Sequence, residues 1–132
     1  MIAYIESSAA AKLLVEEDES AALKAHLDRI HAAGAHLFSS VLLETELRRI
    51  AVRHEIPQEL VTDIVDRFDV VELDRTIFRE AGLMAGPNLR SLDALHVATA
   101  LRLSTDQFLT YDERQAEAAR GAGLRTAGPA PG

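Results

Sequence analysis

The chain of 132 residues contains no cysteine, which excludes disulfide bonds and thiolate chemistry, catalytic or metal-binding. It also has no apolar run near the ~18 residues that a membrane span requires. The apolar N-terminus is interrupted at Glu6 and lacks the basic segment that opens a signal peptide. From these absences we expect a cytoplasmic protein that does not enter a membrane.

Positive charge is scarce as well. The chain has 14 basic and 21 acidic residues, and its net charge is −7. Taken alone, this balance argues against a protein that binds nucleic acid through a bulk positive potential. The objection weakens if several carboxylates converge on divalent cations, because their charge is then neutralised locally.

Apolar residues make up 48% of the chain and charged residues 27%, as in a globular domain of ordinary size. Short apolar runs predict five strands, at residues 2–5, 35–40, 68–73, 106–111 and 123–128. A helix is predicted to begin at Ser7 or Ser8, and further helical patterns cover residues 17–34, 41–54, 57–68, 75–86, 89–103 and 112–123. This alternation predicts an α/β fold with a parallel sheet covered on both faces. We expect one domain over residues 1–128 and a flexible tail over 129–132, where proline and glycine are frequent.

Acidic residues fall near the strand-to-helix junctions of this pattern. Glu6 ends the first strand, and Glu46 lies in the helix after the second; Asp93 begins the helix before the fourth strand, and Asp112 follows that strand. In a parallel sheet with right-handed crossovers these junctions meet at one edge. Carboxylates gathered there, without histidine or cysteine partners, suit Mg²⁺ or Mn²⁺. Such a site supports hydrolysis of phosphodiester bonds.

Simpler structural explanations exist for some of these residues. Asp112 can cap the following helix, with Gln115 three residues on, and capping is compatible with metal binding. Asp93 can lie in a first helical turn capped by Ser91, where the helix dipole favours a negative charge. We interpret His96 as a semi-buried structural histidine rather than a catalytic one.

Glu46 and Glu6 are harder to explain in this way. Glu46 lies at the margin of the apolar stripe of its helix and needs a partner, which a salt bridge to Arg49 or Arg53 would supply. Glu6 ends a buried strand, where glutamate is disfavoured, and no cap is needed before Ser7 because a serine can cap the helix itself. Metal binding is therefore the better explanation of Glu6.

The chain resembles PIN-domain ribonucleases, and among them the VapC-type toxins of bacterial toxin–antitoxin pairs. The resemblance covers nearly the full length and rests on four segments: YIESSAAAKLL, SSVLLETELRRI, LRSLDALHVATAL and FLTYDERQAEAARGAGL. It implies a three-layer α/β/α fold around a parallel sheet of about five strands. It also implies a Mg²⁺- or Mn²⁺-dependent endoribonuclease for structured RNA such as tRNA, a homodimer, and a VapB-type antitoxin as partner.

The resemblance also implies roles for individual residues. It implies metal binding and water activation by four acids: Glu6, Glu46, Asp93 and Asp112. Ser8 would be a metal ligand or would orient one, and Arg114, if it is not simply a solvated surface residue, would contact phosphate.

One departure from the family pattern bears on activity. The family normally has aspartate in a D-[ST]-S motif where this chain has Glu6. The extra methylene moves the carboxylate by about 1 Å, a displacement that can cost on the order of a hundredfold in rate. A catalytically weakened module that mainly binds its antitoxin is therefore the alternative. Two other classes are excluded: the segment ESS lacks the paired aspartates of aspartyl-phosphate phosphatases, and no strand is followed by a glycine-rich dinucleotide-binding motif.

Overall fold

Five parallel strands form the centre of the computed structural model, which describes all 132 residues. In chain order the strands are β1 (Ile2–Ile5), β2 (His36–Ser40), β3 (Asp69–Val71), β4 (Gln107–Leu109) and β5 (Thr126–Ala127). They are arranged in the order β3-β2-β1-β4-β5. The five-stranded parallel sheet predicted from the sequence is confirmed.

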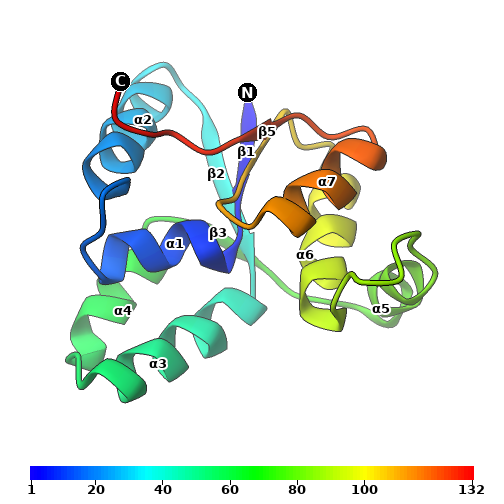
Figure 1. The fold of residues 1–132 in the computed structure, drawn as a ribbon, viewed down its shortest axis with the longest axis horizontal. Coiled ribbons are helices and arrows are strands. Elements are labelled where there is room, and N and C mark those ends of the chain that lie inside the picture. The colour runs from blue at the N-terminus through cyan, green and yellow to red at the C-terminus, as the bar shows by residue number, and fades with distance from the viewer.

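Helices cover both faces of this sheet and complete three layers (Figure 1). They are α1 (Ser7–Leu14), α2 (Ser20–Ala32), α3 (Leu42–His54), α4 (Gln58–Val65), α5 (Arg75–Gly82), α6 (Ser91–Arg102) and α7 (Glu113–Gly121). Helices α1 to α4 lie on one side, and α5 to α7 lie on the other. None of the seven helices has the length and apolar character needed to cross a bilayer.

A buried apolar cluster lies on each face of the sheet, and the alternation of side chains along β1 explains why there are two. Ala3 and Ile5 point to one face and belong to the larger buried cluster, which includes residues of α1 to α4. Tyr4 points to the other face, where it packs with Val97 and stacks on Phe108. Because successive strand residues face opposite sides, a strand buried on both faces must be apolar throughout. The short apolar runs of the sequence reflect this double burial.

The ends of several elements differ from the predicted ones. β4 is confined to Gln107–Leu109, and β5 to Thr126–Ala127, because only these residues find partners on neighbouring strands. Helix α4 ends at Val65 rather than Phe68. Phe68 nevertheless joins the larger buried cluster, so its apolar character reflects packing and not helix length.

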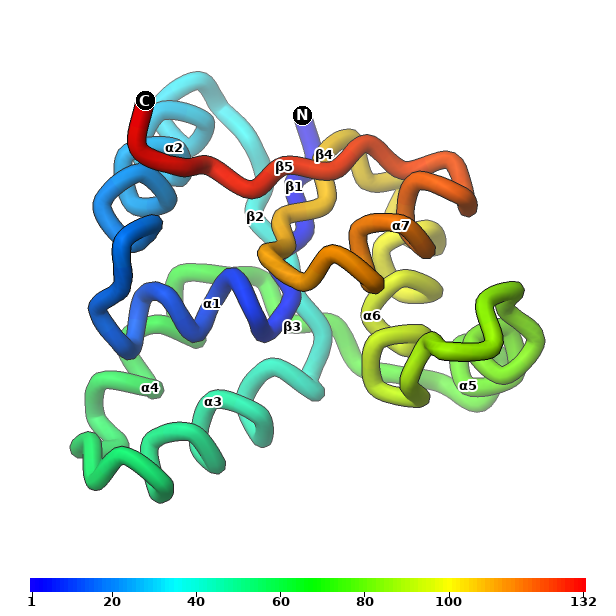
Figure 2. Tube along the Cα trace, viewed as in Figure 1, coloured from blue at the N-terminus to red at the C-terminus, as the bar shows by residue number.

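The order of the strands reverses direction between β1 and β4. From β1 the chain builds outward to β2 and β3 on one side, whereas β4 and β5 lie on the other. Ligands of open α/β sheets bind beyond the carboxyl ends of the strands at such a reversal. Glu6 follows β1 and Asp112 lies three residues beyond the end of the neighbouring β4. Their helices α1 and α7 start near each other at this edge (Figure 2).

The C-terminal residues run past β5 and reach α2 (Figure 1). The hydroxyl of Tyr111 donates a hydrogen bond to the carbonyl of Pro129 at 2.5 Å. Residues 127–132 also line one side of a cavity of about 690 Å³ whose other side is formed by α2 and Asp18. Pro129, within the segment expected to be a flexible tail, is thus in contact with the domain.

Candidate active site

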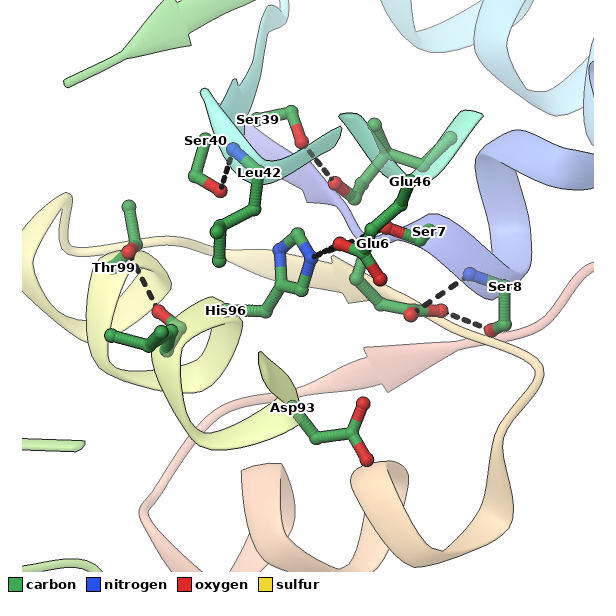
Figure 3. Close-up of polar contacts among 12 residues, drawn as sticks. Glu6, Ser7, Ser8, Ser39, Ser40, Leu42, Glu46, Asp93, His96 and Thr99 are labelled. Carbon is green, nitrogen blue, oxygen red and sulfur yellow. Dashed lines mark hydrogen bonds and ion pairs between the residues drawn. The ribbon is translucent and has the colours of Figure 1, made fainter. Parts of the chain in front are cut away.

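Glu6 is buried directly after β1, with 3% of its surface exposed. Its carboxylate accepts hydrogen bonds from the backbone N–H groups of Ser8 at 2.9 Å and Ala9 at 3.2 Å, and from the Ser8 hydroxyl (Figure 3). Glu6 is therefore the N-cap of α1. Burial raises its pKa. The expectation that no cap is needed before Ser7 was wrong, because the serines do not cap this helix and the glutamate does.

Glu46 projects from the second turn of α3 toward α6. Its Oε1 lies 2.7 Å from Nε2 of His96, which is 1% exposed. Neither Arg49 nor Arg53 forms a salt bridge with it, so the alternative of an arginine partner was wrong. Burial acts to raise the pKa of Glu46, but the hydrogen bond and charge of His96 outweigh it and lower that pKa. The site thus includes a histidine partner that we did not expect from the sequence.

Asp93 is the third residue of α6 and is half-buried. No hydrogen bond reaches its carboxylate, which lies on the α7 side of the site, away from Glu6 and Glu46 (Figure 3). Burial and the nearby Asp112 carboxylate raise the pKa of Asp93. Ser91 does not cap α6, contrary to our prediction; Arg90 occupies the N-cap position and makes no side-chain bond there.

Asp112 caps α7, as the sequence predicts. Its Oδ1 accepts hydrogen bonds from the backbone N–H groups of Arg114 at 2.9 Å and Gln115 at 3.2 Å, which leaves Oδ2 without a donor from the chain. The Gln115 side chain does not reach back to the cap. It is fully buried and donates to the carbonyl of Asp93 at 3.1 Å, which ties α7 to the start of α6. Gln115 therefore sets the position of Asp93 relative to Asp112, a role that capping patterns do not reveal.

The other two predicted site residues differ in their surroundings. The Ser8 hydroxyl bonds to the Glu6 carboxylate, accepts a hydrogen bond from the backbone N–H of Tyr111 at 2.9 Å, and lies 3.3 Å from Oγ1 of Thr110. It therefore links the segments that follow β1 and β4. The Arg114 side chain is exposed and forms no hydrogen bond or ion pair; it lines a cavity of about 720 Å³ beside the loop of residues 84–89.

The side chains do not converge as they stand into a group of three or more that could hold a metal ion. The chemistry of the donors nevertheless fits a hard divalent cation. Asp93 has both carboxylate oxygens free, and Asp112 and Glu46 each have one free of any hydrogen bond from the chain. Repulsion by Asp112 and Glu46 contributes to the raised pKa of Asp93, and a bound cation would relieve that repulsion.

Comparisons with known proteins identify the fold and its family. The family model described as PIN domain matches residues 3–121. The chain belongs to the PIN-domain family. Among curated proteins it is 38% identical over 132 residues to Ribonuclease VapC35 and 34% identical over 129 residues to Ribonuclease VapC46, both of Mycobacterium tuberculosis, with 96% of each chain covered. The resemblance of this PIN domain to the VapC type is thereby confirmed.

Solved structures show the same architecture at low sequence identity. The toxin VapC20 of Mycobacterium tuberculosis, described as cleaving the sarcin–ricin loop, has a TM-score of 0.72 at 13% identity, with 96% of this chain and 99% of that chain covered. VapBC2 of Rickettsia felis, solved bound to a promoter DNA fragment, gives a TM-score of 0.68 at 12% identity and covers 98% and 99% of the two chains. The three-layer α/β/α fold is therefore confirmed.

Proposed function

We propose that this PIN domain is a divalent-metal-dependent endoribonuclease that hydrolyses structured RNA such as tRNA, and that it is the toxin of a VapBC pair. The observation that carries the proposal is the placement of Glu6, Glu46, Asp93 and Asp112. They come from four parts of the chain, and Glu6 and Asp112 follow the neighbouring strands β1 and β4. Glu46 is connected to the start of α1 through His96 and Ser7, and Asp93 is close enough to Asp112 and Glu46 for their charges to raise its pKa. The names of its relatives, which are VapC ribonucleases, support the same activity.

The different surroundings of the four acids suggest different roles for them. Asp93, Asp112 and Glu46 would hold Mg²⁺ or Mn²⁺ through the oxygens that the chain leaves free, and Glu6 would join them or orient the site together with Ser8. The bound metal would polarise the phosphoryl group and lower the pKa of the attacking water. The Asp93 carboxylate accepts no hydrogen bond from the chain, so one of its oxygens could bind the metal while the other accepts a proton from that water.

Unpaired arginines around the acids support an RNA substrate despite the net charge. Arg49, Arg53, Arg90 and Arg114 form no intramolecular ion pair, and they lie on the elements that carry the acids or next to them. Arginines elsewhere are unpaired as well, for example Arg29 on α2, so it is the position of these four that matters. Arg49 and Arg53 line a cavity of about 390 Å³ that also contains Glu46. Guanidinium groups without partners are available to phosphate oxygens. We infer that the RNA backbone lies along this part of α3, with Arg114 as a further phosphate contact.

Cleavage of a labelled tRNA pool tests the proposal. The purified chain with Mn²⁺ or Mg²⁺ should cut the RNA, and EDTA should stop the reaction. Asp93→Asn should lower the cleavage rate by tenfold to hundredfold or more, as expected when a metal site is damaged. Cleavage that continues in EDTA, or that is equal in the Asp93→Asn variant, would refute the assignment.

The catalytically weakened module remains the second candidate, and one observation favours it. Both oxygens of Glu6 already accept hydrogen bonds from α1, so this carboxylate has less capacity for a metal than the other acids. The same cleavage assay separates the two candidates. Binding to a VapB-type antitoxin without detectable cleavage would support the module.

We also propose that the chain binds a VapB-type antitoxin and forms a homodimer. Solved relatives include VapBC complexes, for example VapBC-1 from nontypeable Haemophilus influenzae, with a TM-score of 0.66 at 15% identity over 97% of this chain and 98% of that one. Leu60 on α4 and Phe78 on α5 are about half exposed, which leaves apolar surface for contacts between chains. Light scattering that shows only monomers at micromolar concentration would count against the dimer.

A further inference from the structure

A chain of buried hydrogen bonds runs from the sheet to one of the candidate metal-binding acids. The hydroxyl of Tyr4 on β1 lies 2.6 Å from Nδ1 of His96, and Nε2 of His96 lies 2.7 Å from Oε1 of Glu46. Tyr4 is fully buried and His96 is 1% exposed. The Ser7 hydroxyl lies near the same Nε2 at 3.2 Å. Three elements that are distant in sequence, β1, α6 and α3, are thus joined through one imidazole ring.

The two ends of this chain determine where the histidine carries its proton. An ionised carboxylate can only accept, so Nε2 of His96 must donate to Glu46. Burial raises the pKa of Tyr4 well above its ordinary value, so the phenol keeps its proton. In a neutral ring Nδ1 accepts from this phenol and the hydrogen is on Nε2, and in a protonated ring Nε2 carries a hydrogen as well. Nε2 is therefore the donor to Glu46 in both forms.

We propose that His96 is a positioning residue, which holds Oε1 of Glu46 so that Oε2 stays directed into the acid cluster. The inference rests on the proposed metal-dependent function. In Figure 3 the Glu46 oxygen that is not bound to His96 lies on the side of Glu6. Glu46 has no arginine partner, so without His96 its three side-chain torsions would be free to turn the carboxylate toward solvent. Residues that orient metal-binding groups typically change metal affinity or activity by 10–100-fold when they are replaced.

Two substitutions of His96 separate its contact with Glu46 from its contact with Tyr4. The amide nitrogen of glutamine lies near the place of Nε2, so His96→Gln keeps a donor for Glu46 and loses the contact with Tyr4. Asparagine reaches only the place of Nδ1, so His96→Asn keeps the Tyr4 contact and loses Glu46. The matched control is His54→Asn, because His54 is exposed at the end of α3 and makes no side-chain bond.

The measurements are Mn²⁺ affinity by calorimetry, kcat and KM on a labelled RNA hairpin, and unfolding in urea. His96→Asn should weaken Mn²⁺ binding and lower kcat by about 10–100-fold while KM for RNA changes little. His96→Gln should recover most of both losses, and His54→Asn should match the parent. If His96 only fills the core, both variants should instead lose Mn²⁺ affinity to the same extent, and that result overturns the inference.

A second measurement applies even if the variants at position 96 do not fold. Nitrogen-15 NMR of the metal-free parent should show His96 protonated at Nε2, and Tyr4→Phe should leave Nε2 protonated because the contact with Glu46 remains. A parent ring protonated only at Nδ1 overturns the inference. The outcomes for the proposed function are distinct from these. A parent protein that neither binds Mn²⁺ nor cuts RNA overturns the proposed function and the role of His96 together. A parent that binds Mn²⁺ and cuts RNA, with a His96→Asn variant that is fully active, overturns only the role of His96.

Discussion

Replacing Glu6 tests its two roles at once, because the carboxylate is both the cap of α1 and a candidate metal ligand. Glu6→Ala removes all three hydrogen bonds that the carboxylate accepts. Loss of an N-cap side chain costs about 1 kcal/mol, within a range of about 0.5–2 kcal/mol. For a chain of this length that corresponds to a fall in Tm of about 4 °C. Glu6→Asp should stay close to the parent, since aspartate is a better N-cap and can reach the same backbone N–H groups.

The pH dependence of this loss has a definite sign. Burial raises the pKa of Glu6 above its ordinary value of 4.5, so the folded state holds the proton longer than the unfolded state does. The stability that Glu6 contributes is therefore fully present below pH 4.5 and declines as the pH rises through the raised value. Alanine does not titrate. The difference between parent and Glu6→Ala should thus be largest near pH 4.5 and smaller at pH 8.

Thermal unfolding in EDTA and in excess Mn²⁺ completes the assay. If Glu6 contributes to metal binding, Mn²⁺ should raise the Tm of the parent and of Glu6→Asp more than that of Glu6→Ala, by ligand linkage. Glu6→Asp should also cut RNA faster than the parent, because aspartate restores the usual geometry of the family. Two results would refute this reasoning: an alanine variant as stable as the parent near pH 4.5, or equal Mn²⁺ responses in all three proteins.

Three further predictions concern the core, the acids and the RNA surface. Leu47→Ala, in the buried core, should lower the free energy of unfolding by about 2–5 kcal/mol, and Leu83→Ala, at a position 80% exposed, by less than about 0.5 kcal/mol in urea titrations. Burial and Asp112 raise the pKa of Asp93, so metal-free Asp93→Asn should gain stability relative to the parent as the pH rises from 4 to 7; a constant difference would contradict this. Arg49→Ala and Arg53→Ala should each raise KM for RNA. Each should also reduce the slope of log KM against the logarithm of the salt concentration by about 0.7 per lost phosphate contact, whereas Arg29→Ala on α2 should change neither quantity.

The fold could be predicted from the sequence because its signals are local. Strands such as β1 are buried on both faces, and double burial requires an uninterrupted apolar run. Helices with one buried stripe repeat apolar residues at helical spacing. The alternation of the two, with right-handed crossovers, leaves few topologies other than a parallel sheet. Element ends were less predictable, because β5 stops where its neighbour β4 stops and not where apolar residues end.

The partners within the site could not be predicted in the same way. His96 and Glu46 are 50 positions apart, and their contact depends on how α3 and α6 approach each other across the edge of the sheet. Helical periodicity places Glu46 at the margin of a stripe but does not say what lies opposite. The role of Gln115 was missed for the same reason, since its side chain crosses from α7 to the carbonyl of Asp93.

Capping and metal binding are compatible uses of one carboxylate only when the cap leaves an oxygen free. Asp112 meets this condition, because both backbone N–H groups of α7 bind its Oδ1 and Oδ2 remains available. Glu6 meets it only in part, because α1 binds Oε2 through Ser8 and Oε1 through Ala9 and the Ser8 hydroxyl, and a metal would have to compete with these hydrogen bonds. The longer side chain lets the carboxylate lie across the helix end with both oxygens facing donors. A shorter aspartate at position 6 would cap as Asp112 does, with one oxygen, and that freed oxygen is the physical reason to expect a faster enzyme from Glu6→Asp.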